Sequence, residues 1–171
     1  MADAALTARK LRGLPPVLAP DARVLILGSF PGVASLAAKQ YYAHPRNHFW
    51  PLLAALLDEP LPALDYRARL ARLRHHGIAL WDTIVGCERV GSLDTAIRNA
   101  ERGEIGRVRR AAPAVGLVCF NGKTAGRAEP MWRDAGYETL VLPSTSPAYT
   151  RPFSEKLAAW RAVSAFLERA R

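Results

Sequence analysis

The sequence has few of the residues that build disulfide-linked or metal-bound folds. It contains two cysteines in 171 residues, Cys87 and Cys119, and no CxxC pair or His/Cys cluster at metal-ligand spacing. A disulfide framework and a structural metal site are therefore excluded as the basis of the fold. We expect a reduced protein with no metal ion and no cofactor.

Long hydrophobic runs are also missing. Residues 1–20 hold no apolar core long enough for a signal peptide, and no later run approaches the ~20 residues of a membrane span. We therefore expect a soluble, cytoplasmic protein. A chain of 171 residues, 50% hydrophobic, fits one domain with one core. We predict a single domain over residues 1–171, with residues 1–20 as an N-terminal extension.

Acidic residues are scarce relative to basic ones. Against 15 Asp and Glu stand 24 Lys and Arg, which gives a formal net charge of +9 and an isoelectric point near 10.2. Such a charge attracts polyanions and makes nucleic acid the leading partner. Composition alone leaves a second explanation open, in which the arginines reflect a GC-rich genome and solubility.

Short apolar runs alternate with amphipathic segments along the chain. Brief runs bounded by turn residues predict buried strands at residues 23–28, 77–81, 115–120 and 137–142. Helical spacing predicts helices at residues 47–57, 65–76, 93–110 (broken near Gly103), 123–135 and 154–171, the last capped by Ser154. This alternation predicts a three-layer α/β/α sandwich with a central four-stranded, mostly parallel sheet.

A polar turn follows each predicted strand. The turns are residues 28–32 (GSFPG), Asp82 with Thr83, Asn121 with Gly122, and residues 144–147 (STSP). In an open parallel sheet the ligand crevice lies beyond the carboxyl ends of the strands. The sequence therefore predicts one cleft lined by all four turns, although Asn121 and Gly122 are also typical of a simple turn.

Residues 41–50 (YYAHPRNHFW) concentrate aromatic, basic and amide side chains in one segment. Such a segment can stack a nucleobase on Tyr42 and present Asn47 to a sugar. Without further information the residues favour another interpretation, in which Asn47 caps a helix and Phe49 and Trp50 belong to the core.

Four segments together resemble the uracil-DNA glycosylase superfamily, in particular its mismatch-specific and hypoxanthine-DNA glycosylase branches. They are GSFPG, YYAHPRNHFW, GIALWDTIVGCERVGSLD and VLPSTSPAYTR, in this order within residues 23–152. The resemblance implies the uracil-DNA glycosylase-like fold and a monofunctional DNA glycosylase of base-excision repair. Such an enzyme hydrolyses the N-glycosidic bond of a flipped, deaminated base in double-stranded DNA. We expect it to act as a monomer.

The departures from the family patterns narrow the substrate. Mismatch-specific relatives carry GINPG, whose Asn positions water, whereas Phe30 stands there in this chain. The Asp of the uracil-specific pattern GQDPY is missing too, and Ser144 stands where relatives begin their second motif with His or Asn. These differences resemble the hypoxanthine-DNA glycosylase branch, which uses the Asn of its HPRNHFW segment. The catalytic role therefore falls to Asn47, and the lesion to hypoxanthine.

The resemblance also implies the remaining site residues. Tyr42 would stack on the extruded base, and the backbone amides of residues 29–32 would face a base carbonyl. Asp82 could accept the N1 hydrogen of hypoxanthine, which adenine lacks, or could be only a cap or turn residue. The predicted substrate-binding set is Gly28, Ser29, Phe30, Pro31, Gly32, Tyr42, His44, Asp82 and Ser144.

The second motif is predicted to contact DNA. Ala148 or Tyr149 would fill the gap left by the flipped base, and Arg151 would contact phosphate. The alternative for STSP is a hydrogen-bonded turn. The predicted DNA-binding set is Thr145, Ser146, Pro147, Ala148, Tyr149 and Arg151.

Three other functions remain possible from the sequence. A mismatch-specific uracil or thymine glycosylase is disfavoured by Phe30. A catalytically inactive DNA-binding module would also explain the missing catalytic side chains. A flavodoxin-like nucleotide-binding enzyme fits the strand order but lacks a phosphate loop such as GxxxxGK[ST]. Because no lysine stands in a matched motif as a Schiff-base nucleophile, no lyase step is expected.

Overall fold

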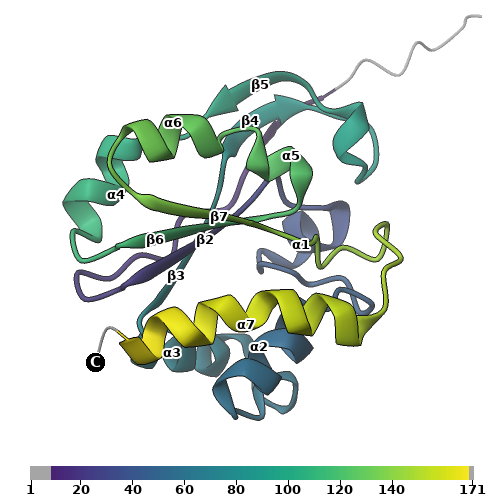
Figure 1. The fold of residues 1–171 in the computed structure, drawn as a ribbon. Coiled ribbons are helices and arrows are strands. Elements are labelled where there is room, and N and C mark those ends of the chain that lie inside the picture. The colour runs from purple at the N-terminus through teal and green to yellow at the C-terminus, as the bar shows by residue number, and fades with distance from the viewer. Residues whose placement is uncertain (1–8, 170–171) are drawn as a thin grey trace, which may run out of the picture.

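The structure is a computed structural model that describes residues 9–169. Its centre is a four-stranded, all-parallel sheet with the strand order β3-β2-β6-β7. The strands are β2 (Val24–Gly28), β3 (Ile78–Asp82), β6 (Leu117–Asn121) and β7 (Glu138–Leu142). Each lies within two residues of its predicted bounds, and the predicted fold class is confirmed (Figure 1).

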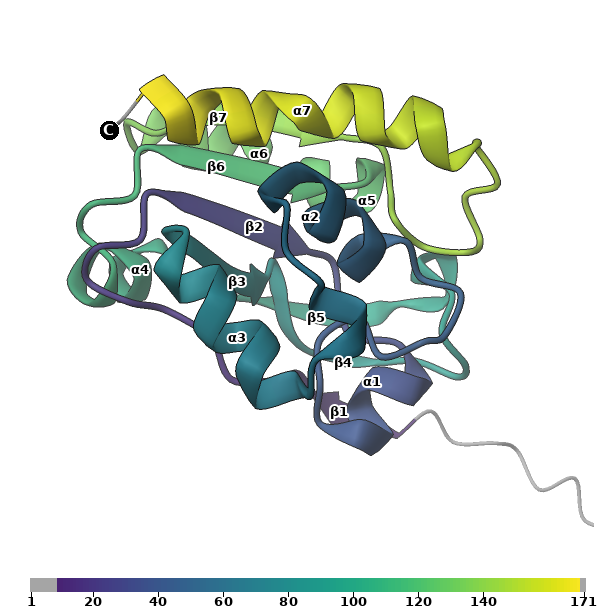
Figure 2. The same ribbon diagram turned by 90° about the horizontal axis from the view of Figure 1, so that it is seen from below.

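Helices cover both faces of this sheet. On one face lie α2 (Phe49–Leu57), α3 (Tyr66–His75) and α7 (Phe153–Arg169), which Figure 2 shows in front of the strands. On the other lie α4 (Ile105–Ala111), α5 (Lys123–Gly126) and α6 (Glu129–Asp134). Val24 and Ile26 of β2 pack toward the first group, and Leu25 and Leu27 toward the second. Burial on both faces explains why the strands are continuously apolar.

The helices predicted at residues 47–57, 65–76 and 154–171 differ from the observed ones mainly at their ends, whereas residues 123–135 form two short helices, α5 and α6. Asp65 caps α3 through a bond from the Ala68 backbone N–H at 2.8 Å. Pro51 lies in the first turn of α2, where a proline is tolerated. Helix α7 begins at Phe153, so Ser154 lies inside its first turn and does not cap it, and residues 170–171 lie outside the described part.

A second, antiparallel sheet has the order β1-β4-β5 and was not predicted. Its strands are β1 (Lys10–Arg12), β4 (Ile84–Glu88) and β5 (Arg98–Arg102). The prediction of a mostly helical segment over residues 93–110 is therefore wrong, since α4 is its only α-helix and η2 (Asp94–Ala96) a single 3-10 turn. Strand β5 reads RNAER, which has no alternating apolar pattern, and pairing with β4 defines it.

The chain before the central sheet belongs to the domain as far as the structure describes it. Strand β1 pairs with β4, and Val17 forms an isolated bridge with Leu80 of β3. Residues 9–20 therefore pack on the domain instead of extending from it, while residues 1–8 of the predicted extension lie outside the described part. Helix α1 (Val33–Ala38), directly after the GSFPG turn, and the short η1 (Leu61–Ala63) were also not predicted.

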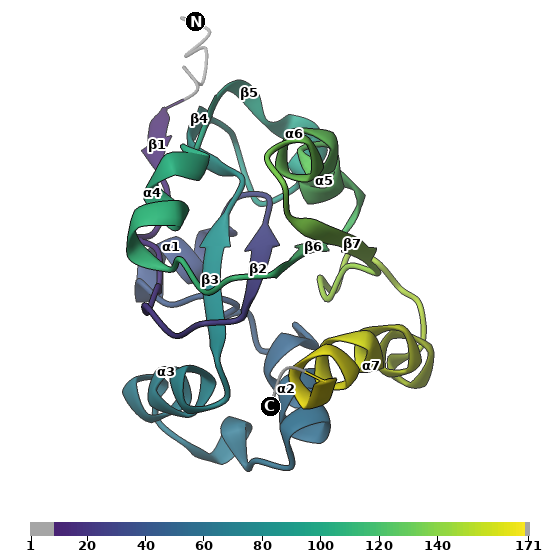
Figure 3. The ribbon, with the colours of Figure 1, turned by 60° about the vertical axis from the view of Figure 1, so that its left-hand side comes forward.

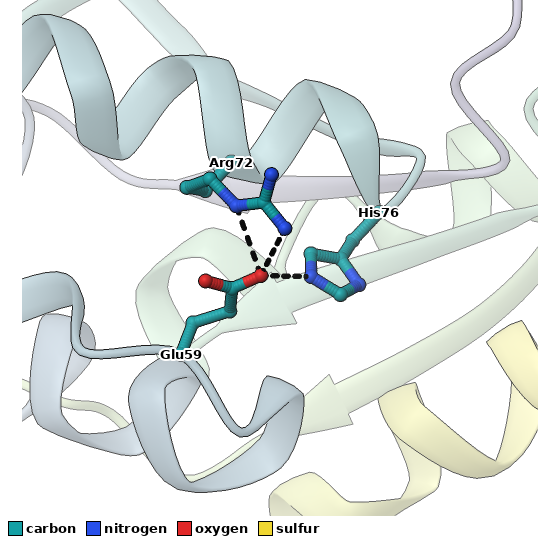
Figure 4. Close-up of polar contacts among 3 residues, drawn as sticks. All are labelled: Glu59, Arg72 and His76. Carbon is teal, nitrogen blue, oxygen red and sulfur yellow. Dashed lines mark hydrogen bonds and ion pairs between the residues drawn. The ribbon is translucent and has the colours of Figure 1, made fainter.

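A polar cluster holds the α2–α3 connection at the end of the sheet away from the GSFPG turn (Figure 4). Oε1 of Glu59 accepts hydrogen bonds from Nε of Arg72, at 2.9 Å, and from Arg72 Nη2. The same oxygen lies 2.9 Å from Nε2 of His76, which follows α3 just before β3 begins. The bonds from Arg72 and His76 lower the pKa of Glu59 to about 2.

We predict that Glu59→Gln lowers the melting temperature at pH 7 without changing the activity of the distant site. A carboxylate whose folded-state pKa is depressed stabilises the fold above its unfolded pKa and loses this effect as the pH falls through its folded value. The deficit should therefore be full above about pH 4.5 and shrink toward pH 2. Thermal unfolding followed by circular dichroism checks this, with Glu168→Gln on the exposed surface of α7 as the control. An equal deficit at pH 2.5 and pH 7 would contradict it.

Candidate active site

A cavity of about 490 Å³ opens beyond the carboxyl ends of the parallel strands. The four turns predicted to line a cleft all line it, and residues of the 41–47 and 92–95 segments complete its wall. Of the predicted site residues, only Arg151 does not line the cavity. Arg151 is exposed and pairs through Nε with Oε2 of Glu155 at 3.0 Å.

Asp82 is the buried acid of this cavity. It ends β3 and lies opposite Gly28 in the parallel register, which brings it beside the GSFPG turn. Asp82 is 6% exposed, and its Oδ2 has no hydrogen-bond partner among the described residues. A Cβ on Gly28 would lie 2.5 Å from Oδ1 of Asp82 and 3.1 Å from the hydroxyl of Tyr42. Because Gly28 has no side chain, the Asp82 carboxyl and the Tyr42 hydroxyl both have room at the buried end of the cavity.

The environment of Asp82 favours the protonated form of its carboxyl up to near-neutral pH. Burial, followed by the negative charge of Asp94, raises the pKa of Asp82 to about 7, and the positive charge of Arg89 opposes this rise. Burial disfavours the charged form because the carboxylate loses its water. A cavity-lining carboxyl with such a pKa and a free oxygen is typical of a functional site.

Tyr42 lies on the same cavity wall in an uncommon backbone conformation. Its φ of 56° falls in the left-handed region, which a bulky residue rarely adopts. One face of its ring stacks on Phe49, with ring centroids 3.8 Å apart, and its buried hydroxyl has no partner among the described residues. Burial raises the pKa of this hydroxyl, so it stays a neutral donor.

Asn47 combines the two roles that the sequence left open. Its Oδ1 accepts a bond from the backbone N–H of Phe49 at 2.9 Å, so Asn47 caps the first N–H of α2 from the position before the N-cap residue His48. Asn47 also lines the cavity. The turn before it is fixed by His44, whose carbonyl accepts from the Asn47 N–H at 3.0 Å and whose Nδ1 accepts from the Arg46 N–H at 3.1 Å. The cap holds the amide in place and leaves its Nδ2 without a partner in the described part of the chain.

Arg89 holds the GSFPG turn in place. Nη2 of Arg89 donates to the carbonyl of Pro31 at 2.5 Å, and its guanidinium lies over the ring of Phe30, 5.1 Å from the centroid. Arg89 is buried, and its Nε and Nη1 have no partner among residues 9–169. Phe30 was predicted to bind substrate, but it is 6% exposed and packs with Ile84 and Cys87. Its ring therefore supports the turn, and offers little surface to a ligand.

The loop after β7 is fixed by three hydrogen bonds. Thr145 donates its N–H to Oδ1 of Asn121 and accepts from Asn121 Nδ2, both at 2.9 Å, while its carbonyl accepts from the His48 N–H at 3.0 Å. Thr145 is 1% exposed. Its predicted contact with DNA does not fit this burial, because its hydroxyl is already bonded inside the protein.

Helix α7 also holds the loop after β7 in place. Lys156 is fully buried, its Nζ donates to the carbonyl of Ser146 at 3.4 Å, and it lies 5.4 Å from the centroid of the Tyr149 ring. Trp160 donates through Nε1 to the carbonyl of Pro143 at 2.9 Å. These contacts leave Ala148 and Tyr149 exposed at the mouth of the cavity.

Sequence reasoning missed several of these supporting residues. Asn121 was noted only as a turn residue, although an amide directly after a buried strand was a usable signal. Arg89 lay inside a matched segment, but only the tertiary structure shows that it is buried. Lys156 and Asp94 carry no local signal, since one sits on an amphipathic helix and the other in a segment expected to be helical.

Residues 9–169 contain neither a metal-binding cluster nor a membrane-spanning helix. No group of three or more His, Cys, Asp or Glu side chains in this range could hold a metal ion. No helix in the same range is both long and apolar enough to cross a membrane.

A cavity that gathers an aromatic ring, an amide and a buried carboxyl at the ends of a parallel sheet suits an extruded nucleobase, which enzymes hold by stacking and hydrogen bonds. Residues 15–167 match the model of the Uracil DNA glycosylase superfamily, and the chain belongs to this family. The protein is a DNA glycosylase.

Named relatives and a solved structure agree with this assignment. A Hypoxanthine DNA glycosylase of Methanosarcina barkeri (strain Fusaro / DSM 804) is 40% identical over 151 residues, which cover 88% of this chain and 96% of that protein. A second Hypoxanthine DNA glycosylase, from Methanosarcina acetivorans, is 40% identical over 152 residues, covering 89% and 96%. The NMR structure of a candidate uracil DNA glycosylase from Methanosarcina acetivorans is 39% identical, with a TM-score of 0.85, and covers 94% of this chain and 99% of that one.

We predict that Asp82→Asn raises the melting temperature at pH 8 by several degrees. The stability that an acid with a raised folded-state pKa contributes is full below its unfolded pKa and is lost progressively as the pH rises to the folded value. The gain from the substitution should therefore grow between about pH 4 and pH 7 and stay constant above. Scanning calorimetry across this range checks it, with Asp134→Asn, exposed on α6, as the control. A variant less stable than wild type at pH 8 would contradict the assignment of Asp82 as a destabilising charge.

Proposed function

We propose that this DNA glycosylase removes hypoxanthine from deoxyinosine in double-stranded DNA and leaves an abasic site with an intact backbone. Two relatives at 40% identity carry the name Hypoxanthine DNA glycosylase. The observation that carries the proposal is the free Oδ2 of Asp82 at the buried end of the cavity. The reaction as proposed uses water alone and the protein acts as a monomer.

Asp82 is the group that recognises the base. In its ionised form its free oxygen accepts the N1 hydrogen of hypoxanthine. Adenine has a lone pair at N1, which would face the ionised carboxylate without a hydrogen between them. Because an unpaired buried polar group costs about 1–3 kcal/mol or more, this contrast favours the deaminated purine over the normal one.

Tyr42 holds the extruded base by stacking. Phe49 covers one face of its ring, so the other face is the one available to a ligand. Flipping a nucleotide costs a few kcal/mol, and less for a mispaired base such as inosine. Ala148 or Tyr149, exposed at the cavity mouth, would fill the gap in the duplex.

The leaving base becomes negatively charged as its bond to the sugar breaks. The backbone N–H groups of the GSFPG turn supply hydrogen-bond donors for this charge. Arg89 donates to the Pro31 carbonyl, which polarises the Pro31–Gly32 peptide and strengthens its N–H as a donor. The buried guanidinium also offsets the repulsion between the leaving base and the Asp82 carboxylate. Such fixed dipoles and charges are the largest source of catalysis in many enzymes.

Asn47 holds the water that attacks the sugar. The free lone pair of Oδ1 and the Nδ2 group orient a water molecule without deprotonating it strongly. The new bond joins this water oxygen to the anomeric carbon, the N-glycosidic electrons leave with the base, and the proton of water is released to solvent or to the base.

We predict that Asn47→Ala slows base release from an inosine-containing duplex about 10²- to 10³-fold in single-turnover assays. Alkaline cleavage of the abasic product measures the rate, with uracil, xanthine and undamaged adenine duplexes in parallel. Asn47→Ser is the matched variant, because its hydroxyl can still cap α2 and restore the melting temperature while the amide is gone. Full activity in the serine variant would show that only the cap matters. Release of uracil and not hypoxanthine by the wild type would overturn the substrate, and strand scission without alkali would overturn the intact backbone.

We also predict that the single-turnover rate rises with pH through about 7, as Asp82 loses its proton. Arg89→Met should shift this rise to higher pH, because the positive charge that lowers the Asp82 pKa is removed. It should also lower the plateau rate through loss of the bond to Pro31. The midpoint of each rate profile, measured between about pH 5 and pH 9, checks this prediction. A rate that falls through pH 7 would assign the protonated form of Asp82 as the active one and contradict this mechanism.

A further inference from the structure

A second groove adjoins the base cavity. It has a volume of about 480 Å³ and lies between β5 and the region of α5. Asp94, Thr95 and Thr124 line both spaces, so the groove continues the cavity beyond its wall. Apart from Thr83, its lining residues were not part of any site that the sequence indicated.

The groove is lined by three exposed arginines. Arg98 and Arg102 come from β5, and Arg127 follows α5. Nη1 of Arg98 donates to the carbonyls of Thr95 and Ile97, at 2.9 and 2.8 Å, which fixes its position and keeps its charge. Arg102 and Arg127 form no side-chain hydrogen bond or ion pair with residues 9–169.

The acidic side chains near these arginines form their bonds with other residues. Glu101 belongs to β5 but pairs with Lys10, at 3.2 Å, and with Arg12, at 3.0 Å, on the neighbouring edge strand β1. Glu88 accepts from Nδ2 of Asn99 at 2.9 Å. Asp94, the one carboxylate that lines the groove in the described structure, accepts from the Ser29 hydroxyl at 2.8 Å. The groove is therefore positively charged.

The position of the groove matches the path of a DNA strand. The β4–β5 hairpin and α5 lie on one side of the central sheet, whereas the loop before α7 lies toward the other (Figures 1 and 3). The base cavity, lined by both Thr124 and the loop residues Ser144 to Tyr149, lies between them. A strand that places one nucleotide in the cavity and contacts the loop on one side must leave on the other.

We propose that this groove binds the phosphates of the lesion-containing strand next to the flipped nucleotide, through Arg98, Arg102 and Arg127. The proposal rests on the proposed function only in that the strand enters with a base in the cavity. Guanidinium groups suit phosphate because their donors match its oxygens in pairs. The second sheet therefore has a function of its own, which is to extend the DNA-binding surface past the base cavity.

The double variant Arg102→Gln/Arg127→Gln tests the groove, since neither side chain supports the fold through a bond within residues 9–169. Its affinity for a fluorescein-labelled inosine duplex, measured by anisotropy from about 50 to 300 mM KCl, should fall roughly tenfold or more near 100 mM salt. The slope of log K against log salt should decrease by about 1.8, because each phosphate contact contributes about 0.9. Undamaged duplex should lose affinity to a similar degree. At saturating enzyme, the single-turnover rate of base release should stay within about twofold of wild type.

The control is Arg74→Gln/Arg161→Gln, which removes the same charge from the exposed surfaces of α3 and α7. Equal salt slopes for the two double variants would overturn the proposal, because net charge alone would then explain the effect. A groove variant that binds normally but releases base slowly would also overturn it. If the wild type released no base from inosine, the proposed function would fail, whereas the salt slopes on undamaged duplex would still decide the groove.

Discussion

The close approach of Gly28 and Asp82 is the constraint on which the active site depends. The parallel register of β2 and β3 sets these residues opposite one another at the strand ends. Because glycine has no side chain, the carboxyl of Asp82 and the hydroxyl of Tyr42 can both reach the buried end of the cavity. Each then carries a polar atom that no described residue satisfies. Such atoms are costly in a folded protein, and a ligand that pairs with them recovers that cost.

The groups around this constraint are held by bonds from outside the cavity. Arg89 fixes the GSFPG turn at Pro31, Asn121 fixes the second loop at Thr145, and the cap of α2 fixes Asn47. Lys156 supports the second loop from α7. A site whose side chains are already in position spends little free energy on ordering them when substrate arrives. The residues that hold the site thus come from the second sheet, from the end of β6 and from the helical layer formed by α2 and α7.

In the functions proposed above, the parallel sheet serves the chemistry and the antiparallel sheet serves the binding of DNA. The parallel sheet supplies the base cavity, and the antiparallel sheet supplies its outer wall near Asp94 and the arginines of β5. Arg89, which follows β4, joins the two by reaching from the second sheet to the turn after β2. This arrangement explains why the segment between β3 and α4 is long and polar without being disordered or helical.

The sequence by itself determined the central sheet, the helices α2, α3 and α7, and the four turns that form the cavity. Their apolar periodicities are local, and the carboxyl ends of parallel strands meet at one edge, so the turns had to converge. It also singled out Asn47, Tyr42 and Asp82 by residue type and motif. Only the tertiary structure decided that β4 and β5 pair, because a polar edge strand such as RNAER takes its conformation from its partner. The tertiary structure alone likewise decided that Arg89, Lys156 and Thr145 are buried. It also decided that the Phe30 ring packs against the second sheet and that Oδ2 of Asp82 has no partner among the described residues. Burial depends on which distant segments pack together, and no local pattern in the chain records that.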